Sequence, residues 1–333
     1  MVGIEHLHLF ELVGGLLDAG AELRCHAAGG DSLADAFEVW QPSSRRCATA
    51  DEVLADPAVD LVVLAGIPCD RAAVALAALV SGRSVLSDKP GATTPAQLDE
   101  LRAAATAGGG RWWVLFSERF GVPAVEEAVR LARLGAVGEV VHVQGAAPHR
   151  GSLGLRPDWF FDRSRSGGIL VDLGSHQADQ FLAVTGAGEL GLPVEVVSAA
   201  AGNVASPDRP GFEDVGEMVL AAGAARGHHR VDYLEADGFP TWGDVRLVVT
   251  GTSGRLEVRT ELAGDGTAGP VGLWCCDDDG VRRVEVATSA DWAARLLADL
   301  DDGGERLMTR DHPFRVTELT LRAAAAAGPW GAP

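Results

Sequence analysis

The sequence predicts an α/β protein of two domains: a doubly wound parallel sheet over residues 1–121 and, over 122–333, an α+β domain with a mainly antiparallel sheet. Three observations predict this arrangement. Short apolar runs alternate with helical patterns in the first part of the chain, which is typical of βαβ units. Strand-like runs joined by Gly/Pro turns dominate the second part, as in antiparallel sheets. The length of 333 residues suits two domains, each with its own core.

The first domain is expected to bind its ligands at one edge of the sheet. Thr94 is a predicted N-cap for a helix that has Pro95 in its first turn. Strands are expected at 21–25, 59–65, 84–87 and 112–116, and helices at 71–81 and 95–107. This alternation gives a parallel sheet covered by helices, and ligands bind at the carboxyl ends of such strands.

The second domain is expected to begin with a helix and to end with two. Helices are predicted at 124–134, 169–184, 291–300 and 314–327. Strands are predicted at 139–145, 194–200, 217–222, 229–234, 245–250 and 255–259. Cys275 and Cys276 are expected on opposite faces of a further strand. Segments 201–216 and 263–272 are rich in Gly and Pro and are expected to be loops.

Charge and cysteine usage argue against several classes of function. The net charge of −19 leaves no basic stripe for nucleic acid and opposes binding to an anionic membrane surface. No apolar run is long enough to span a membrane, and the N-terminus lacks the basic start of a signal peptide. The five cysteines, an odd number without CxxC spacing, argue against a disulfide framework or a zinc site. We therefore expect a cytoplasmic protein that binds neither nucleic acid nor membranes.

Lys89 is the only lysine of the chain, and it directly follows a predicted strand. All other Lys/Arg positions are arginine. An arginine stays charged at any ordinary pH, whereas a lysine can lower its pKa and release a proton. Lys89 is therefore a candidate proton donor or acceptor. The alternative is a surface lysine spared by drift in an arginine-rich composition.

Asp172, His176 and Asp179 fall at positions i, i+4 and i+7 of a predicted helix, which places all three on one face. A carboxylate one turn from an imidazole can orient it and raise its basicity. Two other interpretations remain. The three residues can form a solvated polar face, or they can bind a divalent metal ion, although no further ligand is evident beside them.

Two motifs together resemble the Gfo/Idh/MocA oxidoreductases, a family that includes glucose–fructose oxidoreductase and inositol dehydrogenase. The first is Asp88-Lys89-Pro90 after a strand, with Asp88 in place of the usual Glu. The second is the GG-x3-D-x-G-x-H-x2-D run over residues 167–179. Segments 135–141 and 251–258 are also similar to the family. The resemblance implies a Rossmann domain and an open-faced sheet domain.

The resemblance also implies hydride transfer between a nicotinamide cofactor and an alcohol or ketone carbon of a sugar, inositol or related polyol. Carried over residue by residue, the catalytic side chains are Lys89, Asp172 and His176, which also contact substrate. His176 can take the hydroxyl proton while Lys89 holds the oxygen and Asp172 places the ring or the substrate. Lys89 remains an alternative base. Further substrate contacts are expected from the preceding loop, at His149, Arg150, Arg156 and Trp159.

The cofactor half of the pattern is weaker. A Rossmann domain opens with G-x-G-x-x-G, and here only Gly3 matches, with Glu5 and His8 in place of the second and third glycines. The carboxylate of Glu5 faces a diphosphate unfavourably, and His6 or His8 can offset its charge. The expected cofactor-binding residues are Gly3, Glu5, His6, His8, Pro68, Asp88, Lys89 and Glu118.

The acid that usually receives the ribose hydroxyls is missing, because Ala27 and Ala28 stand at its place. Asp31 replaces it only if the loop folds back. No arginine is there to favour a 2′-phosphate, so NAD is expected, with NADP as the alternative.

Two alternative functions follow from these departures. A cofactor-degenerate member of the family would act as a binding or regulatory module. A metal-dependent isomerase or lyase would use Asp172, His176 and Asp179, although we expect no metal. The family resemblance also implies a homodimer or homotetramer, formed through an apolar open face of the second sheet.

Overall fold

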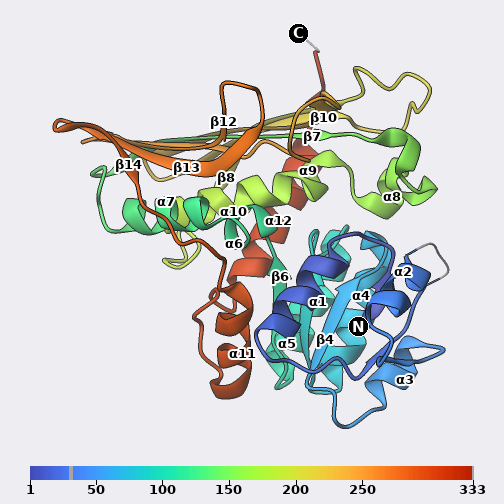
Figure 1. The fold of residues 1–333 in the computed structure, drawn as a ribbon. Coiled ribbons are helices and arrows are strands. Elements are labelled where there is room, and N and C mark those ends of the chain that lie inside the picture. The colour runs from blue at the N-terminus through green and yellow to red at the C-terminus, as the bar shows by residue number, and fades with distance from the viewer. Residues whose placement is uncertain (30–32, 332–333) are drawn as a thin grey trace. The chain divides into compact units, whose positions relative to one another are not determined.

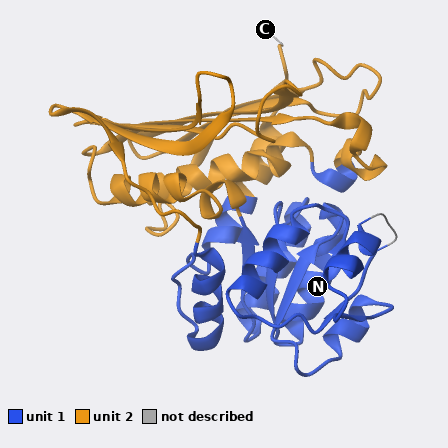
Figure 2. Cartoon of the chain, in the orientation of Figure 1, with its two compact units in different colours: residues 1–115, 164–167, 291–317 blue, residues 116–163, 168–290, 318–333 orange. Residues whose placement is uncertain are grey.

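The computed structural model describes residues 1–29 and 33–331, which form two compact units (Figure 2). Unit 1 contains residues 1–115, 164–167 and 291–317, and unit 2 contains the rest. The chain first changes unit between Leu115 and Phe116, close to the predicted boundary at 121. Residues 291–317 return to unit 1, which a single boundary in the sequence does not represent.

Unit 1 contains a parallel sheet of the doubly wound type (Figure 1). Its strands are β1 (Val2–Ile4), β2 (Cys25–His26), β3 (Arg45–Arg46), β4 (Leu61–Ala65), β5 (Ser84–Asp88) and β6 (Trp112–Leu115). β1, β4, β5 and β6 are neighbours in that order, and a parallel bridge from Val2 to Ala27 adds the pair β2–β3 beside β1. The order 3-2-1-4-5-6 reverses between β1 and β4, which is where such folds bind ligands.

The helices of unit 1 are α1 (Leu9–Asp18), α2 (Ala34–Trp40), α3 (Ala50–Leu54), α4 (Pro68–Val80), α5 (Pro95–Ala107) and α11 (Trp292–Asp302). Helix α5 has the predicted bounds, because the side chain of Thr94 accepts from the Gln97 amide and Gln97 caps Thr94 in return. Helix α4 begins at Pro68, three residues earlier than predicted. The strand expected at 21–25 is confined to β2, since residues 21–24 make no ladder.

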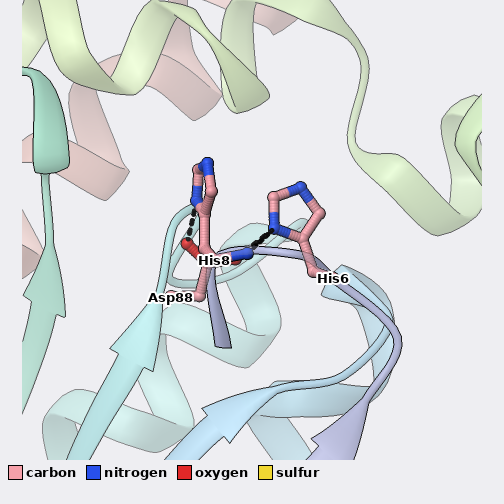
Figure 3. A group of neighbouring side chains, drawn as sticks. All are labelled: His6, His8 and Asp88. Carbon is pink, nitrogen blue, oxygen red and sulfur yellow. Dashed lines mark hydrogen bonds and ion pairs between the residues drawn. The ribbon is translucent and has the colours of Figure 1, made fainter. Parts of the chain in front are cut away.

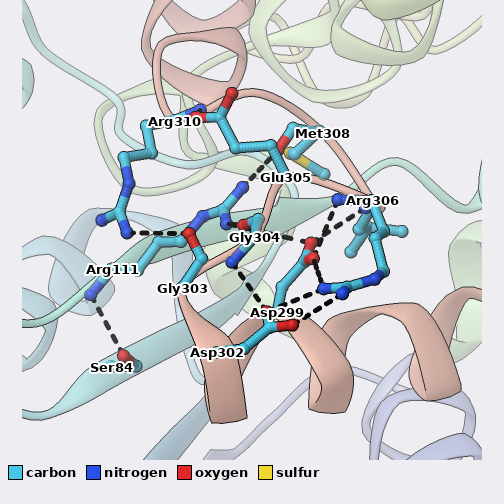
Figure 4. Close-up of polar contacts among 11 residues, drawn as sticks. Ser84, Arg111, Asp299, Asp302, Gly303, Gly304, Glu305, Arg306, Met308 and Arg310 are labelled. Carbon is cyan, nitrogen blue, oxygen red and sulfur yellow. Dashed lines mark hydrogen bonds and ion pairs between the residues drawn. The ribbon is translucent and has the colours of Figure 1, made fainter.

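Arg111 binds the returning segment 291–317 to the sheet of unit 1 (Figure 4). Its guanidinium donates to the carbonyls of Gly304 and Met308, and its backbone amide donates to the Ser84 hydroxyl over 3.1 Å. Asp299 of α11 lies 3.8 Å from the guanidinium and also binds Arg306. These contacts explain why the segment belongs to unit 1 although it follows unit 2 in sequence.

Unit 2 is built on a nine-stranded sheet within the described residues. In sequence its strands are β7 (Val140–Arg150), β8 (Glu195–Gly202), β9 (Val215–Ala222), β10 (Ala225–Glu235), β11 (Arg246–Gly251), β12 (Arg255–Leu262), β13 (Ala268–Asp277), β14 (Gly280–Val284) and β15 (Gly328–Pro329). The order across the sheet is 14-13-12-11-7-10-9-8-15. Only the pairs β7–β10 and β8–β15 are parallel among these strands, so the predicted mainly antiparallel sheet is confirmed.

Strand β13 corrects one prediction and agrees with another. It begins at Ala268, so the loop expected at 263–272 is shorter. Glycine lowers strand propensity but does not prevent pairing with β12. Cys275 is buried and Cys276 is partly exposed, as expected for neighbours on opposite faces.

Helices cover one face of this sheet (Figure 1). Besides α11, the helical elements after β6 are α6 (Ser117–Phe120), α7 (Pro123–Arg133), α8 (Arg163–Ser166), α9 (Ile169–Asp172), α10 (Gly174–Thr185) and α12 (His312–Ala326), with 3-10 turns at Leu153–Leu155 and Asp158–Phe161. Helices α7, α9 and α10 pack on the strands. Glycines in the strands allow the close approach: a Cβ on Gly227 would lie 2.6 Å from Phe181 of α10. The single helix expected at 169–184 is divided at Leu173.

The opposite face of the sheet is mixed: charged side chains alternate with partly exposed apolar ones such as Val219, Val248 and Trp274. Its exposed positions include Glu217, Arg226, His228, Arg230, Arg246, Arg255 and Arg259. Val231, Leu247 and Val258 occupy the alternate positions of the same strands and are buried. Alternation along each strand therefore directs these apolar side chains toward the helices.

No helix among the described residues combines the length and the apolar character that crossing a membrane requires.

Candidate functional site

A crevice of about 230 Å³ lies at the carboxyl ends of β1, β2 and β4, where the strand order reverses. Its walls combine apolar side chains with Gly3, Gly29 and Gly66, which expose backbone because glycine has no side chain. Gly3 has φ +74°, and a Cβ there would lie 2.5 Å from the Gly66 Cα. Both observations explain the glycine, because the conformation is left-handed and the two strands nearly touch. The crevice fits the nucleotide half of a dinucleotide in place and in backbone exposure.

Next to this crevice, two histidines bind one carboxylate (Figure 3). The Nδ1 atoms of His6 and His8 lie 3.0 and 2.9 Å from the two oxygens of Asp88, which ends β5. The loop from β1 to α1 carries both histidines, so residues at the positions of the usual glycine loop hold the end of β5. Figure 3 shows Nδ1 of each ring turned toward Asp88 and Nε2 turned away.

The charge state of this cluster follows from burial and from its neighbours. Burial raises the pKa of the Asp88 carboxyl, but His8, His6 and Arg71 outweigh that effect and hold the pKa well below its usual value. Burial lowers the pKa of His6 to about 4. Near pH 7, therefore, Asp88 is ionised and His6 is neutral.

Arg71 of α4 is the buried counterion of Asp88, and sequence reasoning missed it. Its guanidinium lies 3.2 Å from Asp88 Oδ2 and donates to the carbonyls of Gly66 and Lys89 over 2.6 Å each. The signal that could have revealed it is a charged residue within an otherwise apolar helical pattern. The donor atoms of His6, His8 and Asp88 lie within 4.8 Å of one another, as metal ligands do. The positive charge of Arg71 on the same carboxylate opposes a bound cation there.

Lys89 follows β5 and is buried in the structure. Its positive charge acts on the neighbouring His6, whose pKa it helps to lower. Its carbonyl is fixed by Arg71. Pro68, another expected cofactor residue, begins α4 just after the crevice residues Gly66 and Ile67. The cofactor-side predictions for Gly3, Glu5, His6, His8, Pro68, Asp88 and Lys89 thus all lie in unit 1 at one edge of the sheet.

In unit 2, polar side chains lie where α9 ends and α10 begins. Asp172 ends α9, and its Oδ2 accepts a hydrogen bond of 2.5 Å from the Tyr233 hydroxyl on β10. His176 lies in the first turns of α10 and is 2% exposed. Burial, followed by the charge of Asp172, raises the pKa of Tyr233 well above its usual value, so the phenol remains a donor. Tyr233 is the only tyrosine of the chain, and that is the one signal in the sequence that could have singled it out.

Glu118, expected at the nicotinamide, belongs to unit 2 and binds α10. The side-chain amides of Gln177 and Gln180 donate to Glu118 Oε2 over 3.2 and 3.4 Å. His149 lies 3.7 Å from the same carboxylate. The oxygen of the Gln177 side chain accepts from His229 Nδ1 over 3.3 Å. This network fixes α10 against the strands and thereby positions His176.

Asp179 is bound by an arginine, which weakens the metal hypothesis. Arg119 donates to both Asp179 oxygens, over 2.6 and 2.7 Å, in a buried bidentate pair. A carboxylate held this way is already neutralised. Among the described residues, Asp172, His176 and Asp179 do not gather their donor atoms into a metal-ligand set.

The remaining predicted substrate residues surround an aromatic patch in unit 2. The Arg156 guanidinium lies 4.9 Å from the centre of the Trp242 ring and 4.5 Å from that of Phe160. Arg150 lies 5.7 Å from Trp242, which is 41% exposed, whereas Trp159 is buried. Exposed aromatic faces flanked by arginines suit stacking and hydrogen bonding to a polyhydroxylated ligand.

A larger cavity, of about 540 Å³, lies at the opposite ends of the unit 1 strands. It is lined by residues that precede β2 and β4, such as Leu23 and Asp60. Ligands of doubly wound sheets bind at carboxyl ends, so the smaller crevice is the better candidate site.

Comparison with known proteins connects both parts of the chain. Residues 18–116 match the model described as the oxidoreductase family, NAD-binding Rossmann fold. Residues 125–257 match the model described as the GFO/IDH/MocA C-terminal domain. The first match begins after the loop that carries Glu5, His6 and His8, the segment whose sequence departs most from the usual glycine pattern.

Solved and curated relatives agree with these matches. A protein from Erwinia carotovora atroseptica, whose assignment as an oxidoreductase is itself inferred, is 33% identical to this chain with a TM-score of 0.93. The match covers 99% of this chain and 98% of that protein. A levoglucosan dehydrogenase, solved with NADH and levoglucosan, is 17% identical with a TM-score of 0.81. The match covers 97% of this chain and 96% of that protein, and at this identity it shows the fold alone. D-xylose dehydrogenase from Paenarthrobacter nicotinovorans is 26% identical over 136 residues, and the match spans only 34% of its length.

Proposed function

We propose that this chain, which belongs to the GFO/IDH/MocA family of oxidoreductases, transfers a hydride to or from a nicotinamide cofactor. The other reactant is a secondary alcohol or ketone of a sugar, inositol or related polyol. The cofactor is NAD, in keeping with the family of the N-terminal domain. Two similar proteins are named as dehydrogenases of D-xylose and of levoglucosan, which supports a sugar-like substrate.

The position of Lys89 carries this proposal. It follows β5, whose neighbour β4 ends at the crevice, and parallel strands present their carboxyl ends at the same edge. Its backbone is held by Arg71, and its immediate neighbour Asp88 holds the loop that follows β1. The only lysine of an arginine-rich chain thus stands where a reacting group is expected in this fold.

In the proposed reaction His176 takes the hydroxyl proton of the substrate, and Lys89 donates a hydrogen bond to the same oxygen. Asp172, anchored by the Tyr233 hydroxyl, positions the imidazole or the sugar. Bound NAD supplies the hydride acceptor. Arg150, Arg156 and Trp242 hold the other hydroxyls and the face of the ring, with His149 and Trp159 behind them.

The test combines binding with turnover on the full-length protein. Calorimetry with NAD, NADH and NADPH measures the cofactor, and reduced-nicotinamide absorbance measures turnover on aldoses, inositols and anhydrosugars. We expect turnover on one of these classes, and Lys89→Met should lower kcat by roughly 10²–10⁴-fold. Lys89→Arg is the matched control, because it keeps the charge but cannot release the proton. Wild-type turnover in Lys89→Met would remove Lys89 from the mechanism.

A binding or regulatory module is the second candidate function. The observation that favours it is the loop after β1, in which the carboxylate of Glu5 and the rings of His6 and His8 stand where glycine amides usually face a diphosphate. This candidate requires that calorimetry detect no nicotinamide dinucleotide binding at millimolar concentration, and micromolar binding would exclude it.

We also propose a cytoplasmic setting and self-association. None of the five cysteines, all of which lie in the described part of the chain, is in a disulfide. Free thiols suit a reducing compartment. A homodimer or homotetramer would use the outer face of the unit 2 sheet, where the Arg and Glu side chains of one copy can pair with those of another.

A further inference from the structure

The crevice between β1 and β4 contains the carboxylate of Glu5, which stands at a loop position that usually holds glycine. Glu5 follows β1, and its side chain extends across the crevice to the segment after β2. A Cβ built on Gly29 would collide with Glu5 Oε1. The other oxygen, Oε2, lies 3.1 and 3.2 Å from the positions that Cβ atoms on Gly3 and Gly66 would take. Three glycines from the ends of three strands therefore make room for this one side chain.

The place that the carboxylate reaches is one where Rossmann domains need an acid. In that fold an Asp or Glu at the end of the second strand accepts hydrogen bonds from the ribose of the adenosine half. Here β2 is followed by Ala27, Ala28 and Gly29, none of which has a polar side chain. Residues 27–29 supply no carboxylate, whereas Glu5 brings one to Gly29 from the neighbouring strand.

We propose that Glu5 is the ribose-binding acid of this chain: its carboxylate accepts hydrogen bonds from the 2′- and 3′-hydroxyls of the adenosine ribose of NAD. This inference rests on the proposed function and assigns the role to a loop position that usually holds glycine. Residues 27–29 have no acid and the loop after β1 has an additional one, so in this proposal the ribose-binding carboxylate comes from the adjacent strand at the same edge of the sheet.

The charges that line the crevice extend the inference to cofactor choice. Asp70 is a second acidic lining residue, and Arg71 is the sole basic one among the described lining residues. The Arg71 guanidinium is bound to Asp88 and to the carbonyls of Gly66 and Lys89. A 2′-phosphate placed at Glu5 would face its carboxylate in a crevice with a second acid in the lining, and like charges at short range repel. Glu5 therefore also selects NAD over NADP.

The experiment measures binding of NADH, NADPH, ADP-ribose and nicotinamide mononucleotide to the full-length protein, by calorimetry. In Glu5→Gln we expect the Kd of NADH and of ADP-ribose to rise by roughly 10–100-fold, the loss typical of hydrogen bonds to a charged group. Binding of nicotinamide mononucleotide, which lacks the adenosine ribose, should not change. The ratio of the Kd of NADPH to the Kd of NADH should fall in this variant. A thermal melt of Glu5→Gln like that of the wild type shows that the variant is folded.

Asp31→Asn is the matched control, since Asp31 is the first acid in the sequence after β2; it lies outside the described residues. The inference requires that Asp31→Asn bind NADH like the wild type. It is overturned if Asp31→Asn weakens binding and Glu5→Gln does not, or if Glu5→Ala binds NADH more tightly, which would mean that Glu5 excludes the ribose. Wild-type protein that binds none of the four ligands would instead overturn the proposed function, and the inference with it.

Discussion

At the scale of single residues, the Arg71–Asp88 pair is the most consequential contact in unit 1. Both side chains are 1% exposed, and the pair fixes the backbone on either side of Lys89. A buried carboxylate without its partner is far less stable than the pair. The stability of unit 1 therefore depends on the same two residues that hold the candidate catalytic lysine in place.

Replacing Arg71 tests this dependence. We expect Arg71→Met to lower the free energy of unfolding by about 3–5 kcal/mol, because the Asp88 charge stays buried without its guanidinium. Arg283→Met is the control: its pair with Glu261 is half exposed, and such pairs contribute at most about 1 kcal/mol. Urea denaturation compares the two variants. Equal losses would show that burial of the pair does not matter.

A second prediction at this scale concerns His229 in unit 2. Burial, with His228 and His142 adding to it, lowers the pKa of His229 to about 3. Its Nδ1 donates to Gln177, which leaves the buried Nε2 unprotonated. The folded pKa lies below the unfolded value near 6.5, so the unfolded chain binds more protons as the pH falls between these values. Stability should therefore decrease by about 1.4 kcal/mol per pH unit in this window from His229 alone.

The measurement is the free energy of unfolding by urea from neutral pH to about pH 5, for wild type and His229→Gln. The variant should show the shallower pH dependence, whatever its stability at pH 7. Parallel pH profiles for the two proteins would mean that His229 is not the residue responsible.

At the scale of elements, the spacing of β1 and β4 determines whether the crevice exists. Gly3 and Gly20 both have positive φ, +74° and +99°, but only Gly3 has a neighbour that a Cβ would strike. Alanine at either position strains the backbone by roughly 1–2 kcal/mol. At Gly3 it must also push β1 away from Gly66.

We therefore expect Gly3→Ala to lower the melting temperature more than Gly20→Ala and to abolish NADH binding, which Gly20→Ala should retain. Differential scanning fluorimetry and calorimetry measure the two effects. NADH binding by Gly3→Ala at wild-type affinity would show that the crevice is not the nucleotide site.

The elements also show what the sequence could reveal. Strands β4, β5 and β6 and helix α5 were predictable because each has an apolar run or a capping pair of its own. The return of residues 291–317 to unit 1 was not, because no local pattern encodes the contact of Trp292 with Gly15, nearly three hundred residues apart. The site divides in the same way: motifs identified Lys89, Asp172 and His176, whereas the roles of Arg71 and Tyr233 follow from contacts between distant segments.

At the scale of the whole molecule, the outer face of the unit 2 sheet predicts how copies would associate. Arg and Glu side chains at alternate strand positions favour an interface held by ion pairs, which salt weakens. Multi-angle light scattering should detect a dimer or tetramer at low salt and a shift toward monomer as NaCl rises to roughly 0.5 M, where the Debye length is only a few ångströms.

Arg259→Glu on this face should shift the protein toward monomer, and Arg130→Glu on α7, an exposed arginine outside the sheet, should not. A monomer at every salt concentration would contradict self-association. A dimer unaffected by salt and by Arg259→Glu would assign the interface to another surface.

The attachment of segment 291–317 to the Rossmann sheet has a consequence for synthesis. A ribosome makes the strands and first helices of unit 1 early, but α11 and the loop that receives Arg111 emerge only after all of unit 2 apart from its last residues. Until then Gly15 lacks the Trp292 ring and Arg111 lacks its carbonyl partners. Domains usually fold in the order in which they are translated. Here the first unit to begin is not complete until the nascent chain is almost finished. A messenger truncated before codon 291 would therefore encode a Rossmann unit without α11 and without the carbonyl partners of Arg111.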